Sequence, residues 1–304
     1  MKKTYLLFIC LILISNKQIF AKGVGTTGCS FLKIDTVARP VGMGGAFSGI
    51  SDDVNAIRYN PAGLSQINKA EVTLTHNEWI QDIKNEFVGY AQPVGKDWTL
   101  GLTLNYLYTT GLIKRDINGN TLDGTFGAND GMSTLSFSKR FNDNIHLGTN
   151  IKIVREVIEE RNDIAYAVDF GLLYKISDLN IGVVAQNIGS KIELYQESFS
   201  LPLSLRIGLG IKYIKNAIIG IDAAKSIDNQ NDFRIGGEYL LFDILALRAG
   251  YKFNQDENTG KGIHGGAGVK YKNYQADFAF VPYGDLGNTY RISLTFRFGH
   301  SQTK

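Results

Sequence analysis

The chain has 304 residues, with 32 lysine and arginine side chains against 29 aspartate and glutamate side chains. Its basic residues are spread along the chain and form no stripe, which excludes the backbone-driven binding of nucleic acid. The 34 glycines, 17 phenylalanines and 15 tyrosines, with only 5 prolines, indicate a chain of many uninterrupted strands.

The first 21 residues have the pattern of a secretory signal peptide. Lys2 and Lys3 give it a positive start, residues 5–14 form an apolar run, and Ala21 offers a small residue for cleavage. The run is about ten residues, well short of the ~20 that a helix needs to cross a bilayer, and no later stretch comes closer. Any membrane span must therefore be built from strands.

Cleavage after this peptide, residues 1–21, changes the charge and the cysteine count. The peptide carries three of the basic side chains and no acidic one, so the exported chain is close to neutral. It also carries Cys10, which leaves Cys29 alone and excludes an intramolecular disulfide. Residues 23–28 separate Cys29 from the apolar run, so we do not expect lipid attachment there.

Residues 22–66 lack the alternating pattern of the rest of the chain and contain a glycine-rich stretch. Because glycine has no Cβ, Gly42, Gly44 and Gly45 let the backbone come close to other segments. We therefore predict that this segment folds tightly in a confined space, ahead of a barrel over residues 67–304.

Apolar and polar residues alternate with period two from residue 67 to the C-terminus. The clearest run is residues 291–298, where isoleucine, leucine and phenylalanine take one face and arginine, serine and threonine the other. Turn signals divide the chain into about fourteen strands, many of them ~10 residues long, the length that a tilted strand needs to cross a bilayer. Long connections are expected at residues 110–130 and 187–200, against short turns elsewhere.

Two soluble architectures compete with a membrane barrel. A β-sandwich seldom has this many strands without a break, and a lipocalin-like barrel needs only about eight. A transmembrane barrel explains strand number, strand length and signal peptide together, because lipid contacts the apolar face and closure leaves no edge unpaired. We predict an all-β fold: a transmembrane antiparallel barrel of about 14 strands, in contact with outer-membrane lipids of a diderm bacterium after Sec-dependent export.

Four arginines alternate onto the polar faces of the expected strands: Arg206, Arg248, Arg291 and Arg297. We expect these lumen-facing charges to be neutralised by acids such as Asp222, Glu238 or Asp277.

The chain contains no strong sequence motif for catalysis or for binding a cofactor or metal. Residues 23–28 match G-x-G-x-x-G, but they follow a signal peptide and open no helix. Asp52, Asp53 and Asn55 could bind a hard cation such as Ca²⁺, yet further acidic positions are lacking, and helix capping or solvated loop charge is the better interpretation. No two of the four histidines have metal-ligand spacing, and no motif pairs a serine with a histidine. We expect no catalytic residue, cofactor or metal.

The N-terminal segment resembles a known family. Five stretches carry the resemblance, in this order: residues 31–34, 38–39, 42–47, 52–53 and 60–64. They are similar to the N-terminal signature of the PorV/PorQ family, within the FadL-like outer-membrane transporters, and the resemblance continues to the C-terminus. It implies a fourteen-stranded barrel whose lumen is filled by an N-terminal hatch or plug, here residues 22–66. It also implies that Asn60, Pro61 and Ala62 help to hold the hatch, while a turn that opens a short helix is the alternative interpretation.

The functions of the resembled proteins divide. PorV and PorQ proteins serve type IX secretion, whereas FadL-like transporters move hydrophobic molecules through the barrel. Long ligand-binding insertions are not obvious here, so the leading hypothesis is a non-enzymatic barrel of the PorV/PorQ type. It would act in protein export or surface attachment, with secretion-system proteins or exported cargo as partners. The alternative is a FadL-like transporter of small hydrophobic molecules, and the third hypothesis is an outer-membrane lipid hydrolase.

Overall fold

The computed structural model describes residues 25–301 apart from residues 195, 229–230 and 254–259. The predicted signal peptide, residues 1–21, lies outside the described residues. No helix of the described part is long and apolar enough to cross a membrane.

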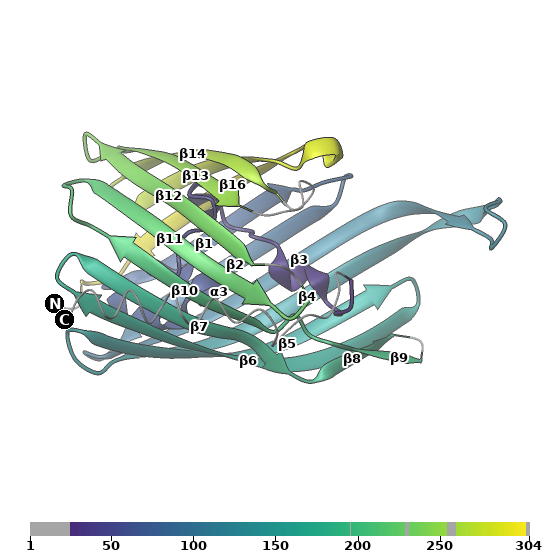
Figure 1. The fold of residues 1–304 in the computed structure, drawn as a ribbon, viewed down its shortest axis with the longest axis horizontal. Coiled ribbons are helices and arrows are strands. Elements are labelled where there is room, and N and C mark those ends of the chain that lie inside the picture. Colours follow the sequence, from purple (N-terminus) through teal and green to yellow (C-terminus); the bar gives the residue numbers. More distant parts are fainter. Residues whose placement is uncertain (1–24, 195, 229–230, 254–259, 302–304) are drawn as a thin grey trace.

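Fourteen antiparallel strands close into one barrel, which confirms the predicted fold class (Figure 1). Strands that are neighbours in sequence pair around the ring, except that β7 pairs with β10, and β16 closes the ring against β1. The strands are β1 (Ala70–Glu78), β2 (Lys84–Val94), β3 (Trp98–Arg115), β4 (Thr121–Arg140), β5 (Ile145–Ile158), β6 (Arg161–Ile176), β7 (Leu179–Gly189), β10 (Ser204–Ile211), β11 (Ala217–Ser226), β12 (Asp232–Leu241), β13 (Leu245–Phe253), β14 (Gly262–Tyr271), β15 (Tyr274–Pro282) and β16 (Asn288–Phe298).

The two ends of the barrel differ. Short connections gather at the end where β16 finishes, here called the turn end: residues 95–97, 141–144, 177–178, 212–216, 242–244 and 272–273. The opposite, loop end carries a separate hairpin of β8 (Lys191–Leu194) and β9 (Glu197–Ser200), inside the long connection expected there.

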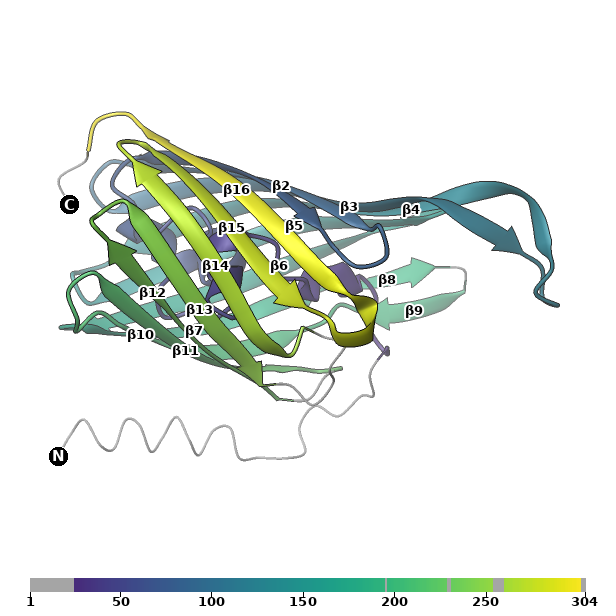
Figure 2. The ribbon, with the colours of Figure 1, turned by 90° about the horizontal axis from the view of Figure 1, so that it is seen from above.

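The other long connection, expected over residues 110–130, was predicted wrongly as a loop. β3 and β4 continue to pair down to Arg115 and Thr121, and this hairpin projects beyond the barrel (Figures 1 and 2). Gly111, Gly119 and Gly124 have positive φ angles, and the register shifts after Thr109. Glycines and shifts interrupt the alternation of side chains, although the backbones still pair.

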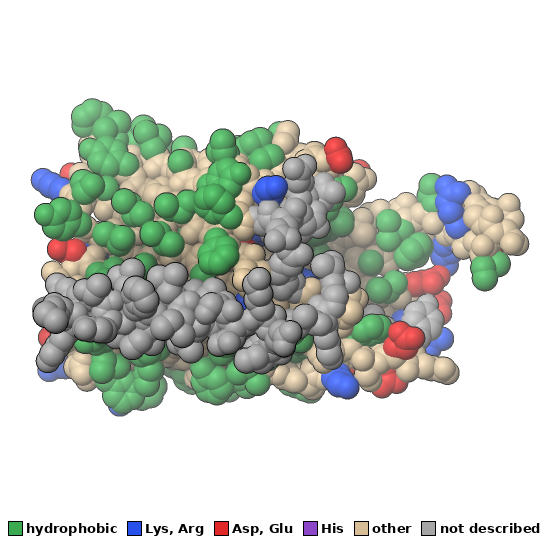
Figure 3. All heavy atoms as spheres, viewed as in Figure 1, with side chains coloured by type: hydrophobic (Ala, Val, Ile, Leu, Met, Phe, Trp, Pro, Cys, Tyr) green, Lys and Arg blue, Asp and Glu red, His purple; other side chains and the backbone are tan. Residues whose placement is uncertain are grey.

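The faces of the strands follow the predicted alternation. In β16, Arg291, Ser293 and Thr295 are buried inside, whereas Ile292 and Leu294 lie outside with 54% and 56% of their surface exposed. Figure 3 shows hydrophobic side chains spread over the outer surface, with charged side chains toward the ends. An apolar belt of this kind is suited to contact with lipid acyl chains.

Residues 29–67, here called the inner segment, lie within the barrel (Figure 2). They form four short helices: η1 (Ser30–Lys33), α2 (Ala38–Gly42), α3 (Ala56–Tyr59) and η2 (Pro61–Gln66). Helix α2 contacts β13 to β16, whereas η2 contacts β3 to β6, so the segment spans the lumen from one wall to the other.

Candidate functional site

A row of inward-facing glycines in the wall makes room for the inner segment. Gly220, Gly236 and Gly250 lie opposite one another on β11, β12 and β13. A Cβ at Gly236 would overlap the carbonyl oxygen of Met43, and one at Gly250 would overlap the backbone nitrogen of Gly44. The backbone of the inner segment therefore rests directly on the backbone of the wall.

The glycines that the sequence singled out lie on the other side of the same contact. A Cβ at Gly42 would be 3.1 Å from the Cα of Gly266 in β14. Gly44 and Gly45 have φ angles of 65° and 75°, in the left-handed region that favours glycine. They turn the chain away from α2 while it remains against the wall.

Asn60 connects the inner segment to itself and to the wall. Its side-chain Nδ2 donates to the carbonyl oxygens of Ser48 and of Leu172 in β6, each at 3.0 Å. Its Oδ1 accepts from the backbone N–H of Ala62 at 3.1 Å and so caps η2, which begins at Pro61. The geometry thus contains both the helix-opening turn and a direct tie to the barrel.

Ala62 forms a second tie, to the neighbouring wall strands. Its carbonyl oxygen accepts from the hydroxyl of Ser138 in β4 at 3.0 Å. A Cβ at Gly148 in β5 would overlap the backbone of Pro61 and Ala62. All members of the motif of residues 60–62 are therefore packed against strands, and their role in this structure is positional.

Arg39 lies at the centre of a buried ionic network. Its guanidinium contacts Asp52 at 2.7 Å and Asp53 at 2.6 Å within the inner segment, and Glu238 of β12 at 3.0 Å. Glu238 also accepts from Arg248 at 2.6 Å. Sequence reasoning missed Arg39 as a site residue, although two acids follow it in the same glycine-rich segment.

The ionic network accounts for Asp52 and Asp53, the two acids that could have bound a cation. Asp52 and Asp53 neutralise Arg39, and Asp53 also accepts from the backbone N–H of Asn55 at 2.9 Å. Within the part of the chain that the structure describes, no three histidine, cysteine or acidic side chains are placed to hold a metal ion.

The four lumen-facing arginines are all directed inward, with different partners. Arg248 contacts Asp277 at 2.8 Å in addition to Glu238, and Arg206 lies 3.7 Å from Asp222. The other two contact groups that the sequence did not indicate. Arg291 donates to the carbonyl oxygen of Asp35 at 3.0 Å, and Arg297 pairs with Glu71 at 2.8 Å.

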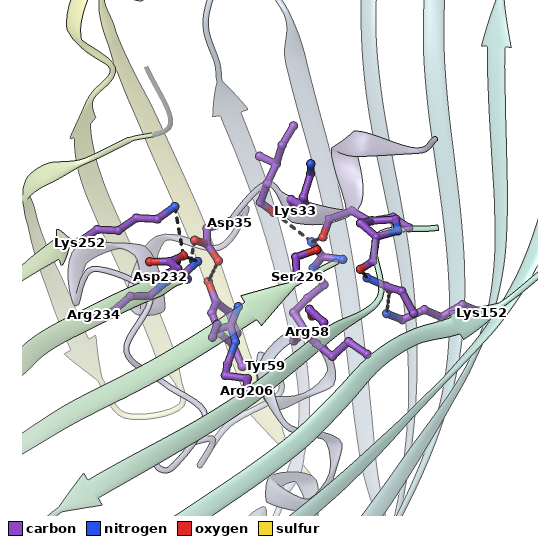
Figure 4. Close-up of a pocket in the computed structure, with 17 residues that line it drawn as sticks. Lys33, Asp35, Arg58, Tyr59, Lys152, Arg206, Ser226, Asp232, Arg234 and Lys252 are labelled. Carbon is purple, nitrogen blue, oxygen red and sulfur yellow. Dashed lines mark hydrogen bonds and ion pairs between the residues drawn. The ribbon is translucent and has the colours of Figure 1, made fainter. Parts of the chain in front are cut away.

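A polar cavity of about 90 Å³ lies between the inner segment and the wall formed by β5, β7 and β10 to β13 (Figure 4). Six basic residues line it: Lys33, Arg58, Lys152, Arg206, Arg234 and Lys252. Among the residues that the structure describes, two acidic ones, Asp35 and Asp232, lie in its lining. The lumen-facing position of Arg206 is the one feature of this cavity that the sequence indicated.

A second cavity, of about 350 Å³, lies at the turn end and includes Ser65 and His146 in its lining. The Ser65 hydroxyl oxygen lies 2.6 Å from Nδ1 of His146, a pairing that no sequence motif revealed. The same oxygen lies 2.8 Å from the carbonyl oxygen of Ala62, and Ser65 is 1% exposed. The Ser65 hydroxyl therefore bridges the imidazole of His146 and the backbone of η2, and it is buried away from solvent.

The model of UPF0164, described as an uncharacterised protein family, matches residues 13–280. The chain belongs to UPF0164. No curated protein matches it in sequence.

Solved structures share the fold of this UPF0164 chain. The P. putida toluene transporter TodX superposes with a TM-score of 0.68 at 13% identity, covering 88% of this chain and 100% of that one. The CymD monoaromatic hydrocarbon channel gives 0.67 at 13% identity, covering 88% and 99%. A Pseudomonas aeruginosa FadL homologue gives 0.64 at 13% identity, also covering 88% and 99%. These likenesses establish a FadL-like fold, and they give no support to membership of the PorV/PorQ family.

Proposed function

We propose that this protein is an outer-membrane transporter in which the inner segment acts as a hatch. The observation that carries the proposal is how the segment is attached. Met43, Phe47, Ile50 and Tyr59 form an apolar cluster within the segment itself. Its contacts with the wall, by contrast, include many hydrogen bonds and ion pairs, made by Arg39, Asn60 and Ala62 among others.

This attachment favours movement of the segment as a unit. Water can replace hydrogen bonds and ion pairs at a small net free-energy change, whereas exposing an apolar cluster to water is costly. The segment has its own core and many polar ties to the wall, beside apolar wall contacts such as those of Leu32 and Val41. It is therefore suited to move as one unit.

Small hydrophobic molecules are the cargo class that we propose. The FadL-like solved structures include a toluene transporter and a monoaromatic hydrocarbon channel. Here, an apolar cluster at the loop end contains Phe31 and Leu32 of the inner segment and Leu107, Met132 and Val154 of the wall. It places apolar side chains where a hydrophobic molecule would meet the hatch.

Uptake measurements test this proposal. Cells that produce the protein should accumulate labelled toluene faster than cells that lack it, and Leu107→Asp should reduce the difference because it charges the apolar cluster. Equal uptake with and without the protein, at matched amounts of folded barrel, would exclude hydrophobic cargo.

A role in protein export or surface attachment is the second candidate. The projecting β3–β4 hairpin favours it, since Ile113, Ile117 and Leu122 are 55%, 101% and 48% exposed there. Exposed apolar side chains beyond the barrel could contact protein partners. The presence of a type IX translocon and of its cargo in the same genome tests this role, and their absence would remove it.

A further inference from the structure

The guanidinium of Arg58 is unusual among the charges around the polar cavity. It belongs to α3 of the inner segment and donates to the carbonyl oxygens of Ile34 at 3.0 Å and of Leu32 at 3.4 Å. No carboxylate of the described residues forms an ion pair with it. Neutral carbonyls satisfy its hydrogen bonds in part and leave its charge uncompensated.

Arg206 faces the same cavity from β10 in the wall (Figure 4). Its nearest carboxylate oxygen, on Asp222, is 3.7 Å away, beyond good hydrogen-bond geometry. Its Nε and Nη1 atoms are buried, and none of the described residues offers them a hydrogen-bond acceptor. The guanidinium also lies over the ring of Tyr59, with 5.6 Å from its carbon to the ring centroid.

Three of the other four basic residues around the cavity are closely paired, and the fourth, Lys252, lies 3.7 Å from Asp232. Lys33 contacts Asp228 at 2.6 Å, and Lys152 contacts Asp169 at 2.7 Å. Arg234 contacts Asp232 at 2.6 Å and Asp35 at 2.8 Å. Among the arginines around the cavity, Arg58 and Arg206 are therefore the least closely paired with carboxylates.

The size and the lining of the cavity define what could neutralise these two arginines. Its volume of about 90 Å³ has room for a small ligand, and its charged lining favours a hydrophilic anion over a hydrocarbon chain. Guanidinium groups bind the oxygens of carboxylate and phosphate with two parallel hydrogen bonds.

We propose that the cavity binds a small hydrophilic oxyanion of the phosphate or short-carboxylate class, between Arg58 and Arg206. Because Arg58 is on the inner segment and Arg206 is on the wall, the bound anion links the two and stabilises the closed hatch. This second effect rests on the proposed hatch function, whereas binding itself does not. The anion is a ligand that holds the hatch closed, distinct from a hydrophobic cargo.

Thermal unfolding of the whole protein in detergent tests the binding. Phosphate or acetate is added at constant ionic strength, with chloride as the reference. A ligand that binds only the folded state raises the unfolding midpoint in a saturable way. We expect this rise in the native protein and at least a tenfold higher ligand concentration for half-saturation in Arg58→Gln and Arg206→Gln.

Controls separate a site from a general salt effect, because phosphate stabilises many proteins by exclusion from their surface. Lys96→Gln removes one positive charge in the turn of residues 95–97, far from the cavity, and should respond like the native protein. A rise of equal size in all variants, or no saturable rise in the native protein, would overturn the proposal. Heat-modifiable gel migration shows which variants fold, and if Arg58→Gln does not, Arg206→Gln and Arg206→Lys decide.

Further measurements identify the class of the ligand and test anion binding separately from its effect on the hatch. Saturable binding of phosphate alone, or of acetate alone, supports the site and names the class. Tighter binding of octanoate than of acetate would contradict a closed hydrophilic cavity. In liposomes, phosphate should slow solute leak through the native protein but not through Arg206→Gln. Saturable binding without this slowing would keep the site and refute its effect on the hatch.

Discussion

Arg39 and Glu238 face each other across the boundary between the inner segment and the barrel wall, joined by two parallel hydrogen bonds of 3.0 Å each. Both side chains are almost fully buried, with 5% and 4% of their surface exposed. The pair is therefore a buried, bidentate and charge-assisted connection between the inner segment and β12.

Arg39→Gln should loosen the hatch. The substitution leaves Asp53 and Glu238 without their shared partner, and removing one member of a buried ion pair costs about 3–5 kcal/mol. We expect faster leak of small solutes from liposomes while the barrel still migrates as a folded band. Lys84→Gln is the control, because it breaks an exposed pair with Glu78 at 3.7 Å. Equal leak in both variants would argue against the role of Arg39.

Gly236→Ala should displace the inner segment, since its Cβ would overlap the carbonyl oxygen of Met43. The neighbouring Gly237→Ala is a matched control, because its nearest atom would be the carbonyl oxygen of Ile218 at 3.4 Å. We expect Gly236→Ala alone to expose the inner segment to added protease. Cleavage at the same rate in both variants would show that the wall glycine does not position the segment.

Two substitutions of Asn60 separate its cap from its tie to the wall. Asn60→Ser keeps a hydroxyl that can cap η2 but loses the donor to Leu172, whereas Asn60→Ala loses both. Leaving the carbonyl oxygens of Ser48 and Leu172 without a donor costs about 1–3 kcal/mol, so both variants should be destabilised and leaky. If Asn60→Ser behaves like the native protein, Asn60 acts only as a helix cap.

A charged side chain on the outer face of β16 should destabilise the barrel in a membrane. Leu294→Lys places an ammonium group on the apolar belt, at a cost of about 2–4 kcal/mol near the middle of a bilayer. Tyr213→Lys, at the turn end, should cost far less. Folding titrations in lipid vesicles measure both. Equal stability of the two variants would contradict a lipid-facing position for Leu294.

The alternation of side chains predicted the fold well because it depends only on neighbours along one strand. It assigned Arg206, Arg248, Arg291 and Arg297 to the inner face, where the structure places them. Period-two patterns fail where glycines interrupt them, which is why the extension of β3 and β4 was taken for a loop.

The candidate site depends on register across strands that are distant in sequence, and one sequence does not contain that information. Arg39 and Glu238 are separated by 199 positions, and nothing near either residue identifies the other. The cavity between Arg58 and Arg206 likewise arises only when α3 is placed against β10. The sequence shows that the chain is rich in glycine, but it does not show that the wall glycines lie opposite one another across β11 to β13.

Deletion of residues 31–56 tests the central claim most directly, because it removes most of the inner segment and leaves every barrel strand intact. The native and the shortened protein are reconstituted at equal amounts of folded barrel, and liposome swelling is measured with small sugars. Our account predicts much faster swelling for the shortened protein. Unchanged swelling, with the barrel folded, would contradict the assignment of the inner segment as a hatch.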